Sequence, residues 1–237
     1  MYDPHAVCDG GDLDCGSGLL LIIKKAIDPI TSGEILEVRS RERTVAEDLP
    51  AWCRMVEHDF LGSEPGEGTT RYFIRKGQSQ SDLKQDLAAA KGYQWSVRTQ
   101  SGRDLTAKVH SRNHTFVAGQ PADFSAKVDA PSAIDYLLAS LASCLVVGFK
   151  ALASKRNVEI DDAELTLKGS LDNILYHMEI ENEGSPKISK ILGTFYVSSP
   201  HEEEQVEEIW RDTLKRSPIY QTLIETVQID IKLSVVF

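Results

Sequence analysis

Hydrophobic and polar positions in the first 77 residues alternate in short runs around two stretches with a helical period. Leu19, Ile23 and Ala26 recur on one face of a helix, while Lys24 and Lys25 point away from that face. This spacing predicts a helix that packs on a sheet. The elements expected here are a strand near residues 5–8, a helix over about 17–27, a strand at 33–39, a helix at about 44–58, and strands near 59–62 and 70–75.

The pattern weakens between residues 78 and 92. This segment combines a polar stretch of Gln and Ser with a short Ala-rich helical pattern that lacks large apolar residues. Such composition is typical of a connection between domains. Since 237 residues suffice for two small domains, we expect one domain at 1–77, a linker at 78–92 and a second domain at 93–237.

The period changes again within the second half. Residues 131–157 are mostly apolar and predict one long helix, which Ser132 begins as its cap, with Asp135 completing a capping box. Strand-like segments are expected from 93 to about 117, and strands at about 163–170, 175–181, 188–198 and 227–235. A helix is expected from Ser199 and Pro200 to about Lys215, with Glu202 at its capping-box position, and a short helix from Ser217 and Pro218.

Charge and hydropathy exclude some function classes. The chain is 41% apolar, enough to build a core in each half, and its formal net charge is -10. No stretch gathers the Lys and Arg that binding to a phosphate backbone requires, so we expect no nucleic-acid partner. The apolar run at 19–23 is too short to span a bilayer, and its basic residues follow it. We therefore expect a cytoplasmic chain with neither signal peptide nor membrane segment.

The four cysteines are the candidate reactive groups. They are too few for a disulfide framework, and none has zinc-ligand spacing, so we expect free thiols, no metal and no cofactor. Cys15 stands just ahead of the first helix, where unpaired N–H groups and the helix dipole favour a thiolate. The alternative is that Cys15 only fills a turn of small residues. Cys53 follows Trp52 in an apolar helical stretch and is expected in the core.

The strings CDGGDLDCGSGLLLIIKKAI, EDLPAWCRMVEH and FIRKG resemble the TusA/SirA sulfur-carrier domain over residues 5–77. The resemblance implies a two-layer α/β sandwich with a single reactive cysteine just before its first helix. Cys15 occupies that place. In that family a Pro-x-Pro follows the cysteine, whereas Gly16 and Gly18 stand there in this chain.

Residues 93–237 resemble an OsmC-like domain, chiefly through the string PSAIDYLLASLASCLVVGF. The resemblance implies an α+β fold around a long central helix, an intertwined homodimer with sites at its interface, and a peroxidatic cysteine, which is Cys144 here. It also implies an arginine on the early strands, a carboxylate near the start of the helix and a late resolving cysteine. The matching positions are Arg103 in SGRD, Asp135, shifted by one residue, and Ser217, which has no thiol.

These features lead to two hypotheses. In the first, Cys144 is a peroxidatic or persulfide-accepting thiol assisted by Arg103, and Cys15 relays sulfur or electrons. Because Ser217 cannot form a disulfide, the second thiol must come from Cys15 or Cys8, or from a separate small thiol, dithiol or sulfur donor. In the second, the chain is a non-catalytic OsmC-like binding, scaffold or regulatory protein.

Burial decides between them at Cys144. Leu137, Leu141 and Val147 occupy neighbouring positions of the same helix and could surround the thiol with hydrocarbon. Burial of this kind raises the pKa of a thiol and makes it inert unless a cation lies close. The cations considered are Arg103 and His114.

Overall fold

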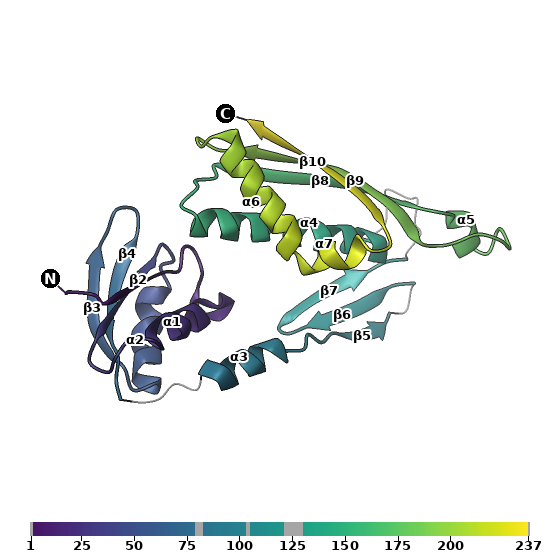
Figure 1. Cartoon of the computed structure of the whole chain (residues 1–237). Coiled ribbons are helices and arrows are strands. Elements are labelled where there is room, and N and C mark those ends of the chain that lie inside the picture. Colours follow the sequence, from purple (N-terminus) through teal and green to yellow (C-terminus); the bar gives the residue numbers. More distant parts are fainter. Residues whose placement is uncertain (1, 79–82, 103–104, 121–129, 237) are drawn as a thin grey trace. The chain divides into compact units, whose positions relative to one another are not determined.

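The computed structural model describes residues 2–78, 83–102, 105–120 and 130–236. The chain divides into two units, the first made mainly of residues 1–94 and the second mainly of residues 95–237. Both combine helices with β-sheets (Figure 1).

The first unit is a four-stranded sheet with two helices on one face. The sheet order is β1-β2-β4-β3, with β1 and β2 parallel and the other neighbours antiparallel. This two-layer arrangement is the one that the resemblance implied. Its elements are β1 (Ala6–Asp9), a 3-10 turn η1 (Cys15–Ser17), α1 (Leu19–Ile27), β2 (Ile35–Ser40), α2 (Val45–Met55), β3 (Asp59–Pro65) and β4 (Thr70–Arg75).

The core of the first unit lies between the helices and the sheet. Leu19 and Ile23 of α1 are fully buried, which confirms the face predicted from their spacing. They pack in one cluster with Leu36 of β2 and with Cys53 of α2. Cys53 is 0% exposed, so its predicted place in the core is confirmed.

A further helix, α3 (Leu83–Lys91), forms within the segment expected to connect the domains. Asp86 of α3 makes an ion pair with Lys24 of α1. This contact ties α3 to the helical layer of the first unit.

The second unit contains two three-stranded sheets. In one, β8 (Asp162–Leu171) is antiparallel to the central strand β9 (Ile188–Ser198), and β10 (Gln228–Val236) is parallel to it. The helices α4 (Ala133–Lys155), α6 (Glu203–Arg216) and α7 (Pro218–Leu223) lie on one side of this sheet (Figure 1). The other sheet is the meander β5 (Arg98–Ser101), β6 (Ala107–Ser111) and β7 (His114–Ala118).

Aromatic side chains hold these helices to the sheet. The ring centroids of Phe149 on α4 and Phe195 on β9 lie 5.0 Å apart, and those of Phe195 and Trp210 on α6 lie 4.8 Å apart. Such edge-to-face and tilted pairs add to the area that the rings bury. Tyr136 of α4 connects the second sheet to the same helix, because its hydroxyl donates to the carbonyl of Val117 on β7 at 2.7 Å.

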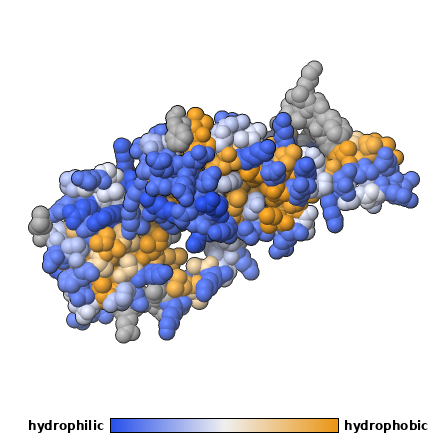
Figure 2. All heavy atoms as spheres, turned by 45° about the horizontal axis from the view of Figure 1, so that its top comes forward, coloured by the Kyte–Doolittle hydropathy of each residue, from blue (hydrophilic) through white to orange (hydrophobic). Residues whose placement is uncertain are grey.

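Two predictions for the second half are wrong. Residues 175–181 do not form a strand: Asn173 accepts a hydrogen bond from the Tyr176 amide and caps the short helix α5 (Ile174–His177) instead. Exposed apolar side chains gather around this segment at one end of the unit (Figure 2). The helix expected from Ser199 begins only at Glu203, and Ser199 instead belongs to a turn in which its hydroxyl donates to the Glu159 carbonyl and accepts from the His201 amide.

Among the described residues, α4 is the one helix long and apolar enough to cross a membrane by length and composition. Only 28% of its most apolar window is buried within the chain. A core helix of a water-soluble protein has the same composition, so this observation does not distinguish the two environments. The expectation of a cytoplasmic chain without a membrane segment stays a prediction.

Candidate thiol site

Hydrogen bonds at its first turn fix the helix that carries Cys144. The Ser132 amide and hydroxyl donate to Asp135 Oδ2 at 2.8 and 2.7 Å, and the Asp135 amide donates back to Ser132 Oγ at 3.0 Å. These bonds confirm the predicted capping box. Asp135 is exposed, and its hydrogen bonds within the described chain are those to Ser132. Its predicted place in a reactive site stays a prediction.

Cys144 lies beside the buried edge of α4. Leu141 and Leu145 are fully buried against the sheet, whereas Cys144 is half-buried and so keeps some access to solvent. The thiol is therefore not sealed in hydrocarbon.

Ser217 lies against the sulfur of Cys144. The distance from Cys144 Sγ to Ser217 Oγ is 3.1 Å, and Ser217 is only 4% exposed. Ser217 caps α7 and accepts a hydrogen bond from the Tyr220 amide at 3.2 Å. A hydroxyl has one proton and two lone pairs, so the Ser217 proton remains able to point at the sulfur. Donated in this way, the proton would stabilise a Cys144 thiolate.

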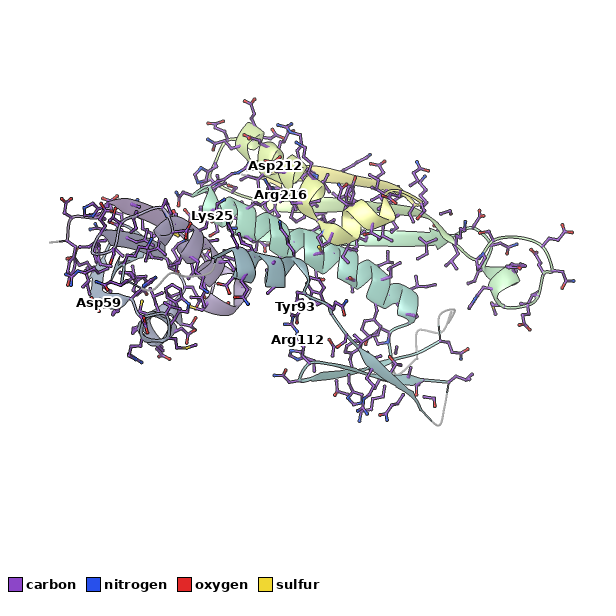
Figure 3. All side chains as sticks on the ribbon, turned by 60° about the horizontal axis from the view of Figure 1, so that its bottom comes forward. Lys25, Asp59, Tyr93, Arg112, Asp212 and Arg216 are labelled. Carbon is purple, nitrogen blue, oxygen red and sulfur yellow. The ribbon has the colours of Figure 1, made fainter. Side chains whose placement is uncertain are left out.

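The cations considered for Cys144 are not seen beside it. Arg103 lies outside the described residues, and His114 is exposed on β7. Arg216, immediately before Ser217, is exposed on α6 (Figure 3). Within the described part of the chain, no hydrogen bond or ion pair joins a cation to Cys144. The predicted Arg103–Cys144 pair stays a prediction.

The surroundings of Cys15 are acidic. Asp14 caps the η1 turn by accepting from the Ser17 amide at 2.6 Å. Partial burial, and then the carboxylates of Asp48 and Asp14, raise the pKa of the Cys15 thiol. The direction is opposite to the one expected from the helix start, because burial and these charges together outweigh the N–H groups of a single 3-10 turn.

The other cysteines are core residues. Burial raises the pKa of Cys8 on β1 to about 11 and that of Cys53 on α2 to about 12. All four thiols are free in the structure. Among the described residues, no group of three or more His, Cys, Asp or Glu side chains is placed to hold a metal ion.

Family models match both halves of the chain. A model described as sulfurtransferase TusA matches residues 18–76, and one described as OsmC-like protein matches residues 125–232. Over 81 residues the chain is 34% identical to YrkF of Bacillus subtilis, a protein named as a candidate sulfur carrier. That alignment covers 34% of this chain and 43% of YrkF, so it spans less than half of that relative.

Solved structures resemble the chain in fold. An OsmC-like protein from Mycoplasma pneumoniae matches with a TM-score of 0.54 and 17% identity, over 62% of this chain and 99% of that one. An OsmC-like protein from Vibrio cholerae matches with a TM-score of 0.50 and 13% identity, over 60% and 99% of the two chains. At these identities the likeness establishes the fold.

Proposed function

We propose that this chain, which joins a TusA-like domain to an OsmC-like domain, is a thiol-dependent redox protein whose reactive sulfur is Cys144. The two family matches support a redox or sulfur-transfer role. The observation that carries the choice of residue is the 3.1 Å contact between Cys144 Sγ and Ser217 Oγ. In this contact a hydroxyl, which is able to donate or to accept, lies beside the sulfur of a half-buried residue.

The proposed reaction reduces an organic hydroperoxide. The Cys144 thiolate attacks one peroxide oxygen, an S–O bond forms as the O–O bond breaks, and the alcohol leaves with a proton. The sulfur has then lost two electrons and is a sulfenic acid. A small thiol condenses with it to a mixed disulfide and water, and a second thiol releases Cys144 and an oxidised disulfide.

Ser217 determines how the sulfenic acid can be reduced. A neighbouring thiol at this position would trap the sulfenic acid as an internal disulfide, but a hydroxyl can only form a hydrogen bond with it. The reductant must therefore reach Cys144 from outside this pair. A small thiol or dithiol fits the access that a half-buried sulfur retains.

Cys15 is the proposed sulfur carrier of the first unit. Its raised pKa keeps most of the thiol protonated at neutral pH, which disfavours rapid direct attack on peroxide. A carrier can work with a slower thiol, since a partner enzyme loads the sulfur onto it. We therefore assign peroxide chemistry to Cys144 and persulfide carriage to Cys15.

We also propose that the chain works as a homodimer. Val147 on the long apolar helix α4 is 67% exposed, and Trp95 and Val97, just before β5, are 79% and 67% exposed. We interpret these exposed apolar side chains as part of an association surface. A second copy would cover it, as the OsmC-like resemblance implies.

The test compares wild type with Cys144→Ser in reduction of cumene hydroperoxide by dithiothreitol or dihydrolipoamide. We expect the substitution to abolish catalysed turnover, and Cys15→Ser to leave it unchanged. Intact mass after one equivalent of peroxide should show one added oxygen atom in wild type and none in Cys144→Ser. Equal turnover in wild type and Cys144→Ser would remove the peroxidase proposal.

Ser217→Cys provides a second arm. Because Cys144 Sγ and Ser217 Oγ lie 3.1 Å apart, the introduced thiol should form a disulfide with Cys144 after oxidation. Neither of these two cysteines should then react with an alkylating reagent. Thr222→Cys, on the exposed side of α7, is the matched control and should keep its thiol. If Ser217→Cys retains both thiols after peroxide treatment, Cys144 is not the oxidised sulfur.

The competing function is a binding or scaffold protein that has kept the fold without the chemistry. The absence of a thiol at position 217 favours it. Such a protein would gain neither oxygen nor sulfur selectively at Cys144 under mild peroxide or polysulfide. The same mass measurement therefore separates the two functions.

A further inference from the structure

The outward face of the β8-β9-β10 sheet carries a polar groove that the thiol chemistry does not use. The groove has a volume of about 510 Å³, within the range of small-molecule sites. The helices α4 and α6 lie on the other side of the sheet, so the groove is separate from Cys144. Its lining residues are Thr166, Lys168, Lys190, Leu192, Gly193, Thr194, Tyr196, Asp230 and Lys232.

Strand register brings three lysines to this groove from three different strands. Lys168 on β8 stands opposite Leu192 on β9, and Lys232 on β10 stands opposite Thr194. Lys190 lies two residues before Leu192, on the same face of the central strand. Lys168 is a diagonal neighbour of Lys190 on the adjacent strand, about 7–8 Å away. Lys232 stands opposite Thr194, four residues or about 13 Å along β9 from Lys190, so the three long side chains approach the centre of the face from different sides.

These ammonium groups make no ion pair with the residues that the structure describes. No ion pair joins Lys168, Lys190 or Lys232 to any acidic residue that the structure describes, and Asp230 is likewise unpaired there. Three positive charges against one negative charge leave the groove positive, although the whole chain has a net charge of -10. Unpaired lysines around a concave surface raise the local concentration of anions.

The remaining lining suits a small anion with an organic part. The hydroxyls of Thr166 and Thr194 add hydrogen-bond donors at the centre of the face. Leu192 is 41% exposed and Tyr196 48% exposed, so the floor also offers apolar area. A long polyanion such as a nucleic acid would meet the net negative charge of the rest of the chain, whereas a small anion would meet only the groove.

We propose that this groove binds a small molecule carrying a multiply charged oxyanion, either a phosphoryl group or a sulfur oxyanion. The three lysines supply the charge, and the two threonines supply neutral donors. Asp230 opposes the anion at the edge of the groove. The proposal involves no covalent step and is independent of the fate of Cys144.

The experiment titrates the full chain with pyrophosphate and with thiosulfate by calorimetry at about 20 mM NaCl, and again at about 300 mM. Pyrophosphate represents the phosphoryl group and thiosulfate represents the sulfur oxyanion. The anion that binds more strongly therefore identifies which of the two groups the groove prefers. Lys168→Gln, Lys190→Gln and Lys232→Gln should each weaken binding about five- to tenfold, since each removes one partly screened charge pair. The higher salt concentration should weaken it as well.

Two further variants distinguish this groove from general surface charge. Asp230→Asn should strengthen binding, because it removes the one negative group of the lining. Lys187→Gln removes the same charge from an exposed position outside the groove and should leave binding unchanged. The proposal is overturned if neither anion binds saturably up to about 10 mM, or if Lys187→Gln weakens binding as much as Lys190→Gln.

Discussion

Glu37 is a charged residue that is buried, although a strand glutamate is normally exposed to solvent. Its side chain is 1% exposed on β2, yet it is charged and held by two arginines. Arg71 Nε and Nη2 donate to its two oxygens at 2.9 and 2.7 Å, and Arg39 Nε donates at 2.7 Å. The Arg71 hydrogen bonds, helped by Arg39, lower the pKa of Glu37 to about 2 against the opposing effect of burial.

Glu37→Gln should therefore destabilise the first unit at neutral pH by about 2 kcal/mol, because it leaves the arginines without their charged partner. In wild type the lowered pKa means that this stabilisation is complete above pH 4.5 and is lost as the pH falls from 4.5 towards 2. Hydrogen–deuterium exchange of the β2 and β4 amides in the full chain measures this change in stability.

Glu64→Gln is the matched control for Glu37→Gln. Glu64 Oε2 lies 3.6 Å from the same Arg71, but the Glu64 side chain is 35% exposed. Its loss should cost under about 1 kcal/mol, as for other solvated pairs. If the β2 amides were equally protected from exchange in wild type and Glu37→Gln at pH 7, the stabilising role of the Glu37 charge would be contradicted.

The sequence could not reveal either Glu37 or the charge state of Cys15. Alternation in strand β2 places Glu37 on the face opposite Leu36, which is normally solvated. Its burial depends on Arg71, which lies 34 residues away in the chain and reaches it only through the β2–β4 register. At Cys15, partial burial in the folded unit, followed by the charge of Asp48 on the distant helix α2, raises the pKa against the local effect of the helix start.

Elements with strong local signals were predictable from the sequence. The long helix around Cys144 and its capping box follow from residues within four positions of each other. The segment 175–181 has enough apolar residues to predict a strand. No strand pairs with it in the described chain, and the Asn173 side chain stabilises a helical turn there. Pairing partners and side-chain caps of this kind depend on the folded chain.

The capping box gives a prediction at the level of the helix. Ser132→Ala removes the hydroxyl that caps α4 and should lower the free energy of unfolding of the second unit by about 1 kcal/mol. Asp135→Ala should have a similar effect, because it removes the reciprocal bond. Ser143→Ala, at an exposed position of the same helix, should change stability little. Exchange protection of the first turn of α4 measures these differences.

The same variants test whether Asp135 has a chemical role. If its role is capping alone, Ser132→Ala and Asp135→Ala should alter peroxide reduction by Cys144 equally. A much larger loss of kcat/KM in Asp135→Ala than in Ser132→Ala, at equal stability, would assign Asp135 to the reactive site. Ser132 lies in the same turn, so the comparison removes the contribution of helix stability.

The oligomeric state of the whole molecule determines whether the exposed apolar side chains of α4 are covered by a second chain. In a single chain only 28% of the most apolar window of this helix is buried, and Val147 is 67% exposed. A charge placed there would have to lose its water on association, so Val147→Glu should disfavour a dimer built on this surface.

We expect wild type to have the mass of two chains by sedimentation equilibrium at micromolar concentration, and Val147→Glu to shift it towards one. Met55→Glu places the same charge at an 82% exposed apolar position of the first unit and should leave the mass unchanged. A monomeric wild type, or an intact dimer in Val147→Glu, would exclude α4 as the interface. Because substitution at an exposed position should not unfold the chain, exchange protection of the β9 core is expected to stay intact in both variants.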